Sequence, residues 1–381
     1  MSFLRWMWAW LNKRAGWLCL GGLGLVALWN WRAWRRDRAL AARLRAEEPE
    51  PVELGATPRV SVLVAAWNEA DMIEGHIESF LALRYPDKEL ILCAGGSDGT
   101  YALARRYADA LVRVLEQQPG EGKQRALRRS LEHASGRVIF LTDADCLLND
   151  EAFERTLAPV VNGTGVASTG TCKPLGHQSK YAFVVYQWAV DHYASLRAPD
   201  TSPGLLGRNS AIDRKVLDTV GAFETDVPTG TDYILARQLM RAGYSIHFAR
   251  FSSVETEYTT NASAYFHQRS RWLRNIIVIG LRTHDYGQVY YGLRTATLGA
   301  GVAVMPLLGF PLGSIALVSW VVVLAHGMLS RIRYVALHPG TNGPSRLRLA
   351  AVAVLSLGLD LLVWGSVLAQ CLLPSWRRRW R

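Results

Sequence analysis

The sequence predicts an α/β domain in the middle of the chain, with one membrane helix before it and about three after it. Three observations support this fold class. Segments with the periodicity of strands and of helices alternate between residues 58 and 260. Long apolar segments lie only outside this region. The positive charge of the chain is concentrated beside those apolar segments, as is typical of membrane proteins.

The first apolar segment, residues 15–31, carries no charge and is at the short end of the roughly 17–25 residues that span a bilayer. No small-residue cleavage site follows it, so we predict a retained anchor and not a signal peptide. Three basic residues precede the segment, and six arginines follow it between residues 32 and 45. The positive-inside rule therefore predicts an external amino terminus and a cytoplasmic middle domain, at an inner or plasma membrane.

The first half of the middle domain alternates between predicted strands and predicted helices. Apolar segments predict strands at 60–67, 89–94, 111–115 and 137–142. Apolar residues at helical spacing predict helices at 70–83, 101–111 and 124–134. Apolar strands that alternate with helices predict a parallel sheet covered on both faces. Ligands of such sheets bind at the carboxyl ends of the strands, so polar residues that follow the strands should converge there.

The carboxyl-terminal part of the chain predicts further membrane helices. Residues 295–330 are apolar, with Pro306 and Pro311 near the middle, which predicts two spans joined by a tight turn. Residues 349–373 predict a third span. The arginines at 331–348 agree with a cytoplasmic loop, but the basic tail at 376–381 does not, because a further span would carry it outside. Either one span is re-entrant or interfacial, or the tail is an exception to the rule.

The net charge of +11 does not predict a nucleic-acid-binding protein. Residues 1–50, 331–348 and 374–381 together hold 17 Lys and Arg against four Asp and Glu, more than the net excess of the whole chain. The basic residues therefore flank membrane segments, where they set the topology and contact anionic lipids. No basic face is left in the middle domain for a phosphate backbone.

Two carboxylates follow the predicted strand at 137–142. Asp143 and Asp145 stand one residue apart, and like charges so placed favour a bound cation. Carboxylate oxygens suit Mg²⁺ or Mn²⁺, which take their other ligands from water and substrate phosphates. Such an ion would neutralise a diphosphate leaving group. An Asp-x-Asp pair also occurs often by chance, so the neighbouring motifs decide its meaning.

Three further motifs accompany the aspartates. Lys123 lies in a Gly-rich approach to a helix, an arrangement that suits a phosphate. Asp232 opens a predicted helix, where capping of the helix is the alternative to a chemical role. Gln268, Arg271 and Trp272 stand at the border between the domain and an apolar segment. Interfacial anchoring would explain the Trp and the Arg, but it would not require the Gln at this spacing.

Taken together, residues 58–275 resemble the family-2 glycosyltransferases of GT-A fold, in the membrane-embedded branch that carries a Q-x-x-R-W motif. This branch includes cellulose, chitin and hyaluronan synthases, poly-N-acetylglucosamine synthases, and ceramide or diacylglycerol glucosyltransferases. Four motifs carry the resemblance in the same order along the chain: 67-WNEA-70, 143-DAD-145, 231-TD-232 and 268-QRSRW-272.

The resemblance implies a Rossmann-like mixed sheet and an inverting transfer of a sugar from a nucleotide sugar, with UDP-sugars expected and Mg²⁺ or Mn²⁺ as cofactor. It implies donor contacts from Asn68, Glu69, Lys123, Asp143, Gln268 and Arg271, and a metal ligand in Asp145. It implies that Asp232 is the general base, and that the acceptor meets Trp272, Gly207 and Asn209.

Two positions depart from the pattern of the family. Cys93 and Ala94 stand where the family usually has one or two Asp, so a contact to uracil is missing or Asp98 replaces it. Thr231 stands where a Glu usually precedes the catalytic Asp. The first departure affects the prediction of which nucleobase the donor carries more than the prediction of the reaction.

We expect the acceptor to be a lipid at the cytoplasmic leaflet, because about four spans barely enclose a polymer channel. A small processive polysaccharide synthase is the alternative, and an oligomer or an accessory subunit would help it. The alternative to an enzyme is a non-catalytic membrane scaffold that binds sugar nucleotides. The organisation we expect is a membrane anchor with a basic linker at 1–50, a catalytic domain at 51–260, an interfacial helix at 261–285 and membrane helices at 286–381.

Two further features lie outside the motifs. The aromatic segment 178–197 predicts an amphipathic helix that either lies on the membrane as an acceptor platform or packs on the domain. Asp360 is expensive in lipid, so we expect it to pair within the protein, with His326 as the partner, or else to lie along an acceptor path.

Overall fold

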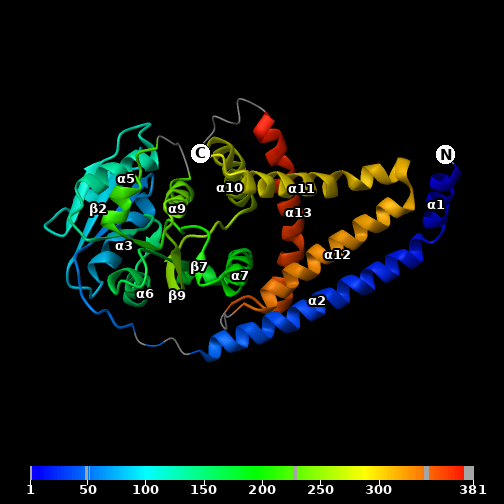
Figure 1. The fold of residues 1–381 in the computed structure, drawn as a ribbon, viewed down its shortest axis with the longest axis horizontal. Coiled ribbons are helices and arrows are strands. Elements are labelled where there is room, and N and C mark those ends of the chain that lie inside the picture. Colours follow the sequence, from blue (N-terminus) through cyan, green and yellow to red (C-terminus); the bar gives the residue numbers. More distant parts are fainter. Residues whose placement is uncertain (1, 48–49, 51, 226–229, 339–342, 373–381) are drawn as a thin grey trace. The chain divides into compact units, whose positions relative to one another are not determined.

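The computed structural model describes residues 2–47, 50, 52–225, 230–338 and 343–372 (Figure 1). The chain divides into two compact units. The helical unit comprises Met1–Glu47, Ser179–Tyr193 and Thr259–Arg381, and the sheet unit comprises Glu48–Gln178 and Ala194–Tyr258. The basic tail at 376–381 lies outside the described residues.

The sheet unit contains nine strands in one mixed sheet. The strands are β1 (Val60–Trp67), β2 (Lys88–Gly95), β3 (Val112–Glu116), β4 (Val138–Leu141), β5 (Cys146–Leu147), β6 (Ala167–Pro174), β7 (Thr201–Ser202), β8 (Ser210–Asp213) and β9 (Ile246–Thr256). The helices that belong to it are α3 (Ala70–Leu81), α4 (Thr100–Arg105), α5 (Gly122–Glu132), α6 (Asp150–Val161), α8 (Arg214–Thr219) and α9 (Thr231–Arg241).

The order of the strands is β3-β2-β1-β4-β8-β6-β9-β5, with β7 paired to β9. The four strands predicted from the first half of the domain are parallel to one another, as expected. From β8 onward the sheet also contains antiparallel pairs, so the mixed sheet that the resemblance implies is confirmed. Strand β1 is a topological switch point, because β2 and β3 follow it on one side of the sheet and β4 is added on the other side. A sheet of this topology binds ligands at the carboxyl ends of the strands beside that point.

Strand β1 shows why the apolar sequence folds in this way. Its side chains alternate between two cores, with Val62 and Val64 in one core and Leu63 in the other. Because both faces are buried, nearly every position must be apolar, and polar residues are confined to the ends. Those ends hold the functional residues described below.

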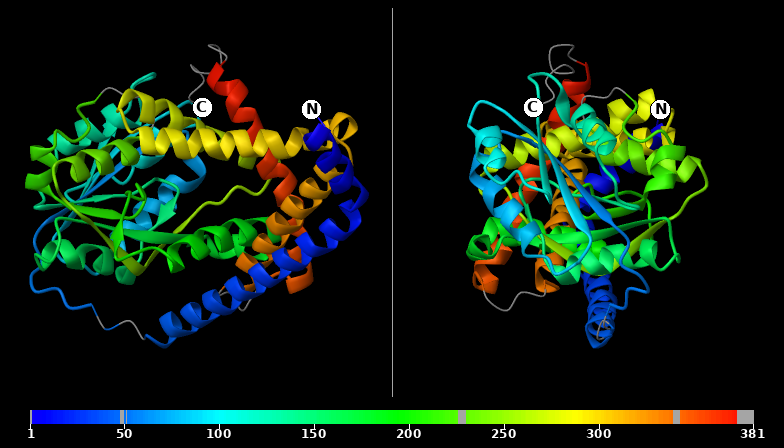
Figure 2. Two further views of the ribbon diagram at one scale, coloured as in Figure 1. Left: turned by 45° about the vertical axis from the view of Figure 1, so that its right-hand side comes forward. Right: turned by 90° about the vertical axis from the view of Figure 1, so that its left-hand side faces the viewer.

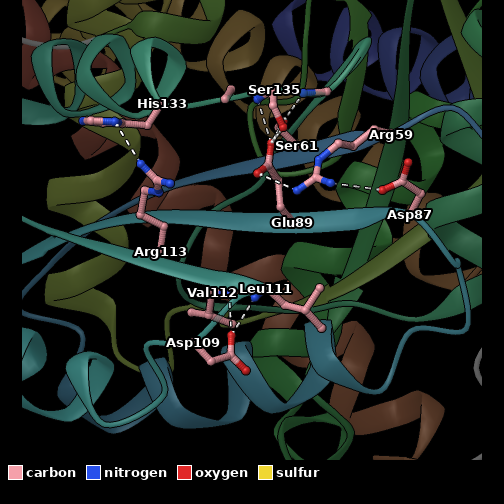
Figure 3. Close-up of polar contacts among 12 residues, drawn as sticks. Arg59, Ser61, Asp87, Glu89, Asp109, Leu111, Val112, Arg113, His133 and Ser135 are labelled. Carbon is pink, nitrogen blue, oxygen red and sulfur yellow. Dashed lines mark hydrogen bonds and ion pairs between the residues drawn. The ribbon is translucent and has the colours of Figure 1, made fainter.

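Helix α4 ends at Arg105, six residues before the predicted end. The reason lies in Asp109, whose carboxylate accepts hydrogen bonds from the backbone N–H groups of Leu111 (2.8 Å) and Val112 (2.7 Å) (Figure 3). An Asp that bonds to nearby backbone in this way favours a turn over a helix. The turn directs the chain into β3.

A charged cluster holds the opposite, amino-terminal edge of the parallel strands together (Figure 3). The carboxylate of Glu89 accepts hydrogen bonds from Ser61 Oγ (2.5 Å), Arg59 Nη2 (3.2 Å), Ser135 N (2.7 Å) and Ser135 Oγ (2.8 Å). Burial raises the pKa of Glu89, but the hydrogen bonds from Ser61, Ser135 and Arg59 outweigh burial and lower it to about 2. The cluster joins β1, β2 and the segment before β4.

We expect Glu89→Gln to lower the free energy of unfolding by roughly 2 kcal/mol at neutral pH, because the charged hydrogen bonds are lost. A carboxyl group whose pKa is depressed stabilises the folded state above its unfolded pKa, and that contribution disappears as the pH falls toward 2. Thermal unfolding of the full chain between pH 3 and pH 7 measures both effects. Glu132→Gln is the control, since Glu132 is an exposed residue that pairs with Arg128 on the same helix. Equal unfolding midpoints for the two variants would contradict this account.

The helical unit contains α1 (Ser2–Lys13), α2 (Ala15–Ala46), α7 (Ala182–Leu196, of which residues 182–193 belong to this unit), α10 (Ala262–Arg282), α11 (Tyr286–Leu312), α12 (Ser314–Ala336) and α13 (Arg346–Leu372). Among the described residues, α12 and α13 are long and apolar enough to cross a membrane. Helix α2 is not shown as a span, because the Trp, Gly and Asn residues within 15–31 lower its hydropathy. The expected four spans are therefore supported for two.

The predicted turn within 295–330 lies at Gly313, where α11 ends and α12 begins. Pro306 lies inside α11 and does not end it. Helix α2 runs alongside α12 (Figure 1 and the left view of Figure 2). Polar contacts join the two helices, between Asn30 Nδ2 and His326 Nδ1 (3.2 Å) and between Arg333 Nε and Asp37 Oδ2 (3.3 Å).

The aromatic helix α7 packs within the helical unit. It buries Val185, Tyr186 and Ala189 in one cluster with Val335 of α12 and Ala353 of α13. The two alternatives from the sequence, a helix on the membrane and a helix packed on the domain, did not name these partners. The sequence pattern showed an apolar stripe but not the helices that would cover it.

The expected pairing of Asp360 with His326 is wrong. Asp360 forms a buried ion pair with Arg331, whose Nε lies 3.1 Å from Oδ2, and it also accepts hydrogen bonds from Tyr265 (2.6 Å) and Tyr186 (3.3 Å). The side chains of Arg331 and Asp360 are about one-tenth exposed. A guanidinium matches a buried carboxylate better than an imidazole does, because it stays charged and offers several N–H donors. Here Nε and Nη2 of Arg331 both donate to Oδ2 of Asp360, while Tyr265 donates to Oδ1. This supports the structural pairing of Asp360 over a role along an acceptor path.

Candidate active site

The site lies at the carboxyl end of β4 in the sheet unit. Asp143 and Asp145 follow this strand directly, and both carboxylates are largely enclosed by neighbouring residues. Burial and the charge of Asp143 raise the pKa of Asp145. Burial also raises the pKa of Asp143, but the charges of Lys123 and Arg208 outweigh it and hold that pKa below its usual value. Two nearby carboxylates with opposed shifts indicate a site that is arranged for added positive charge.

Lys123 and Asp232 come to the same place from different helices. The ammonium of Lys123, near the start of α5, forms an ion pair with Asp143. Asp232, in the first turn of α9, is close enough for its charge to raise the pKa of Lys123, although burial opposes that rise. The N-cap position of α9 is occupied by Gly230, so Asp232 is not needed as a cap. The structure thus brings together Lys123 and Asp143, which were expected to bind the donor, and Asp232, which was expected to be the general base.

Asn68 and Glu69 follow β1, as expected from the sequence. Asn68 has a left-handed backbone (φ 58°), and its side chain accepts a hydrogen bond from Ser97 N (2.8 Å). Burial and the charges of Asp145 and Asp143 raise the pKa of Glu69 to about 7. Glu69 therefore borders the two aspartates, which places the end of β1 beside the end of β4.

Asp98 lies in the loop after β2 and forms hydrogen bonds there. Its carboxylate accepts hydrogen bonds from Ala70 N (2.9 Å), Thr100 N (3.0 Å) and Thr100 Oγ1 (2.6 Å). Both oxygens are thus engaged in joining the start of α4 to the start of α3. This geometry favours a structural role for Asp98 over the contact to a base that its position also allows.

The loop before β8 approaches the site from the other side. A Cβ at Gly207 would lie 3.1 Å from Asp232 Cβ, a tight contact, so the backbone of this loop closely approaches Asp232. Asn209 is fully buried, and its amide bonds to Thr156, Thr171 and Ser252 inside the domain. These bonds fix the loop, which leaves Gly207 and the neighbouring backbone as the surface next to Asp232.

Sequence reasoning missed Arg208 in this loop. Its Nη1 donates a hydrogen bond to Thr256 Oγ1 (3.0 Å), and its Nε lies 3.9 Å from Asp143 Oδ2. The side chain is only 18% exposed, so its charge acts directly on the aspartates. The available signal was that Arg208 is the single charged residue of the segment 204–212, but the direction of its side chain depends on the tertiary fold.

Gln268, Arg271 and Trp272 lie on α10 of the helical unit. Their spacing of three and four residues places them on one face of the helix. Trp272 is 38% exposed, and the guanidinium of Arg269 stacks 4.8 Å from the centre of its ring. The remaining two side chains are half-buried.

The chemistry of the sheet unit fits a divalent cation. Asp143 and Asp145 offer hard oxygen ligands, and the enclosed pair gains stability from a cation. No group of three His, Cys, Asp or Glu side chains among the described residues converges closely enough to hold a metal alone. An ion at this position would therefore take further ligands from water and from a phosphorylated substrate, as Mg²⁺ commonly does.

A mixed α/β sheet with paired aspartates, a lysine and a further aspartate at one edge defines a nucleotide-dependent transferase of GT-A type. Residues 58–275 match the family described as glycosyltransferase like family 2. The match covers more than half of the chain, and the chain belongs to this family.

Individual relatives agree with this assignment. The chain is 26% identical over 203 residues to glycosyltransferase AglE of Haloferax volcanii, covering 50% of this chain and 64% of that protein. It is 27% identical over 232 residues to the beta-monoglucosyldiacylglycerol synthase of Trichormus variabilis, covering 57% of this chain and 49% of the relative. It is 30% identical over 95 residues to the poly-beta-1,6-N-acetyl-D-glucosamine synthase of Staphylococcus epidermidis, covering 24% of this chain and 23% of that protein. The matched parts thus span less than two thirds of each relative.

Among solved structures, the mannosyltransferase PcManGT of Pyrobaculum calidifontis, in complex with GDP-Man and Mn²⁺, superposes with a TM-score of 0.54 at 19% identity. The superposition covers 95% of this chain and 99% of that one. The similarity supports the GT-A-like fold of the sheet unit.

Proposed function

We propose that the protein is a metal-dependent, inverting glycosyltransferase that moves a sugar from a nucleotide-sugar donor, expected to be a UDP-sugar, to a membrane-associated acceptor. The observation that carries the proposal is the convergence of Asp143, Asp145, Lys123 and Asp232 from three elements of the sheet unit. Isolated motifs occur by chance, whereas four ionisable groups at the ligand-binding edge of such a sheet are typical of a catalytic site.

The donor would lie along the carboxyl ends of β1 and β4. Asn68, Glu69 and Asp143 would face the nucleoside, and Lys123 would pair with the phosphates once the donor displaces it from Asp143. Asp145 would hold Mg²⁺ or Mn²⁺ against the diphosphate. When bound, the metal ion neutralises the charge that develops on the leaving diphosphate. Arg208 adds a second fixed positive charge within the same site.

Asp232 would act as the general base. It borders Gly207, so an acceptor hydroxyl that enters past this loop meets the carboxylate before it meets the donor. The carboxylate takes the hydroxyl proton as the oxygen attacks the anomeric carbon from the face opposite to the diphosphate. A single displacement of this kind inverts the anomeric configuration. The resulting proton stays on Asp232 until solvent removes it.

The acceptor is proposed to be a lipid at the cytoplasmic leaflet. Gln268, Arg271 and Trp272 share one face of α10 and fit the Q-x-x-R-W motif. By this resemblance, Gln268 and Arg271 would bind the diphosphate, and Trp272 would stack on the acceptor. An exposed indole suits the apolar face of a sugar at a membrane surface. The relative from Trichormus variabilis is named for a glycolipid product. The relative from Staphylococcus epidermidis is named for a polymer, which keeps a small processive synthase as the second candidate.

The experiment uses full-length protein in lipid nanodiscs with Mn²⁺ and a panel of labelled nucleotide sugars. Products are separated into a lipid extract and a high-mass fraction, and Asp232→Asn serves as the inactive control. One labelled sugar per lipid is the expected result. A labelled ladder or insoluble polymer would instead make the protein a processive synthase. Binding of nucleotide sugars without any labelled product would overturn the proposal in favour of a scaffold.

A further inference from the structure

Strand β5, which begins directly after Asp145, is the last strand of the sheet. Strand β9 pairs with it on one side, and among the described residues no strand follows it on the other. The backbone groups that β5 and the residue after it turn away from β9 therefore need other partners, because buried N–H and C=O groups are costly to leave unpaired. Two such groups are the carbonyl oxygen of Cys146 and the N–H of Leu148, and both residues are buried.

Helix α3 supplies the hydrogen bonds that a further strand would otherwise provide. The imidazole Nδ1 of His76 lies 2.6 Å from Cys146 O, and Leu148 N donates to Ser79 Oγ at 3.0 Å. His76 and Ser79 are three residues apart, so they lie on one face of the helix. Ser79 Oγ also donates to the backbone oxygen of His76 at 2.7 Å, which joins the two contacts.

The hydrogen bond to the carbonyl defines how His76 is used. A carbonyl oxygen only accepts, so Nδ1 carries a proton and donates it. Within the part of the chain that the structure describes, the buried Nε2 has no hydrogen-bond partner, and burial lowers the pKa of the imidazole. The side chain is therefore neutral, and it offers a single donor atom. Because it is fully buried, it acts through Cys146 and not on a substrate.

The carbonyl that His76 holds belongs to the turn that carries the two aspartates. Cys146 N donates to Asp143 O at 3.1 Å, and Glu257 N donates to Asp145 O at 3.3 Å. These bonds hold the turn from within and from the side of β9, while His76 holds it from the side of α3. A metal ligand must keep its distance to the ion within about 0.2 Å, so the backbone that carries it has to be fixed.

We propose that His76 is a positioning residue for the divalent cation, because its Nδ1–H fixes the carbonyl of Cys146 and with it the backbone from which the Asp145 carboxylate extends. This inference rests on the proposed function, in which Asp145 is the metal ligand. Groups that orient metal ligands in this way typically contribute about 10- to 100-fold to metal affinity. His76 lies outside the four motifs that carry the resemblance to the family.

The test measures equilibrium binding of UDP and of GDP to the full-length protein in nanodiscs, with and without Mn²⁺. The readout is the factor by which Mn²⁺ tightens the nucleotide that binds better, expected to be about 100-fold in the wild type. His76→Leu removes the donor, and His76→Gln places its N–H at the position of Nε2, so each should reduce this factor about tenfold. His76→Asn places an N–H at the position of Nδ1 and should keep the factor within about threefold of the wild type.

Ile77→Val is the matched control, since it changes a buried hydrocarbon side chain of the same helix, and it should leave the effect of Mn²⁺ unchanged. Thermal unfolding shows which variants are folded at the temperature of the assay, and His76→Gln carries the test if His76→Leu is not.

An unchanged effect of Mn²⁺ in the folded Leu and Gln variants would overturn the inference, even if both variants were less stable. A loss in His76→Asn as large as that in His76→Leu would overturn it as well, because the hydrogen bond would then not be the cause. If Mn²⁺ does not tighten nucleotide binding in the wild type, the proposed function fails instead, so the two failures are distinguishable.

Discussion

Asp232→Asn should abolish sugar transfer, with a fall in kcat of about 10³-fold or more, while the affinity for the donor stays within a few-fold of the wild type. Asn has nearly the same shape as Asp, so the hydrogen bond from Tyr233 N (2.9 Å) and the contact with Gly207 persist. The amide cannot accept a proton at neutral pH, so the acceptor hydroxyl attacks without a base. The loss therefore falls on the chemical step and not on binding.

The measurement is turnover of a labelled donor in nanodiscs together with equilibrium binding of the nucleoside diphosphate. Asp218→Asn is the matched control, because Asp218 is an exposed residue that pairs with Arg214 on the same helix, α8. Full turnover in Asp232→Asn would remove this residue from the role of base. A parallel loss of donor binding would also contradict the account, since Asp232 is assigned to the acceptor side.

Asp145→Asn should remove the metal dependence of donor binding. In the wild type, Mn²⁺ should tighten the binding of the nucleoside diphosphate by about 100-fold, because the ion joins the carboxylate to the phosphates. In the variant the added effect of Mn²⁺ should nearly vanish. Removal of metal from the wild type with a chelator should reproduce the behaviour of the variant.

Titration of the nucleotide with and without Mn²⁺ measures this effect. Asp71→Asn is a suitable control, since Asp71 is an exposed carboxylate in the first turn of α3. Binding that still depends on Mn²⁺ in Asp145→Asn would contradict the assignment of Asp145 as a metal ligand. Equal loss in Asp71→Asn would point to general electrostatics and not to a specific site.

The sequence predicts the first half of the sheet well, and the reason is physical. Strands such as β1 are buried on both faces, so local composition alone reveals them, and the parallel order follows from the alternation with helices. The predicted strands also give the positions of their carboxyl ends. Residues that follow them, such as Asn68 and Asp143, were therefore expected to lie close together at one edge of the sheet. The end of α4 was missed because the turn depends on one side chain, Asp109, that competes with the helix.

Residues whose role depends on long-range pairing were harder to find. Arg208 acts on Asp143 across 65 positions in sequence. Asp360 pairs with Arg331 from another helix, although His326 had been the expected partner. Helix α7 has an amphipathic pattern, but its partners come from α12 and α13, more than 130 residues away. Composition and spacing indicate the chemical type of a residue, whereas its partners depend on the tertiary structure.

The anomeric configuration of the product tests the central claim most directly. A donor with an α-linked gluco- or galacto-configured sugar is given to the full-length protein in nanodiscs, and the linkage in the purified product is read from its proton NMR coupling constant. A single displacement with Asp232 as base predicts a β-linked product. An α-linked product would contradict the account, because it would require either a covalent intermediate or attack from the same face as the leaving diphosphate.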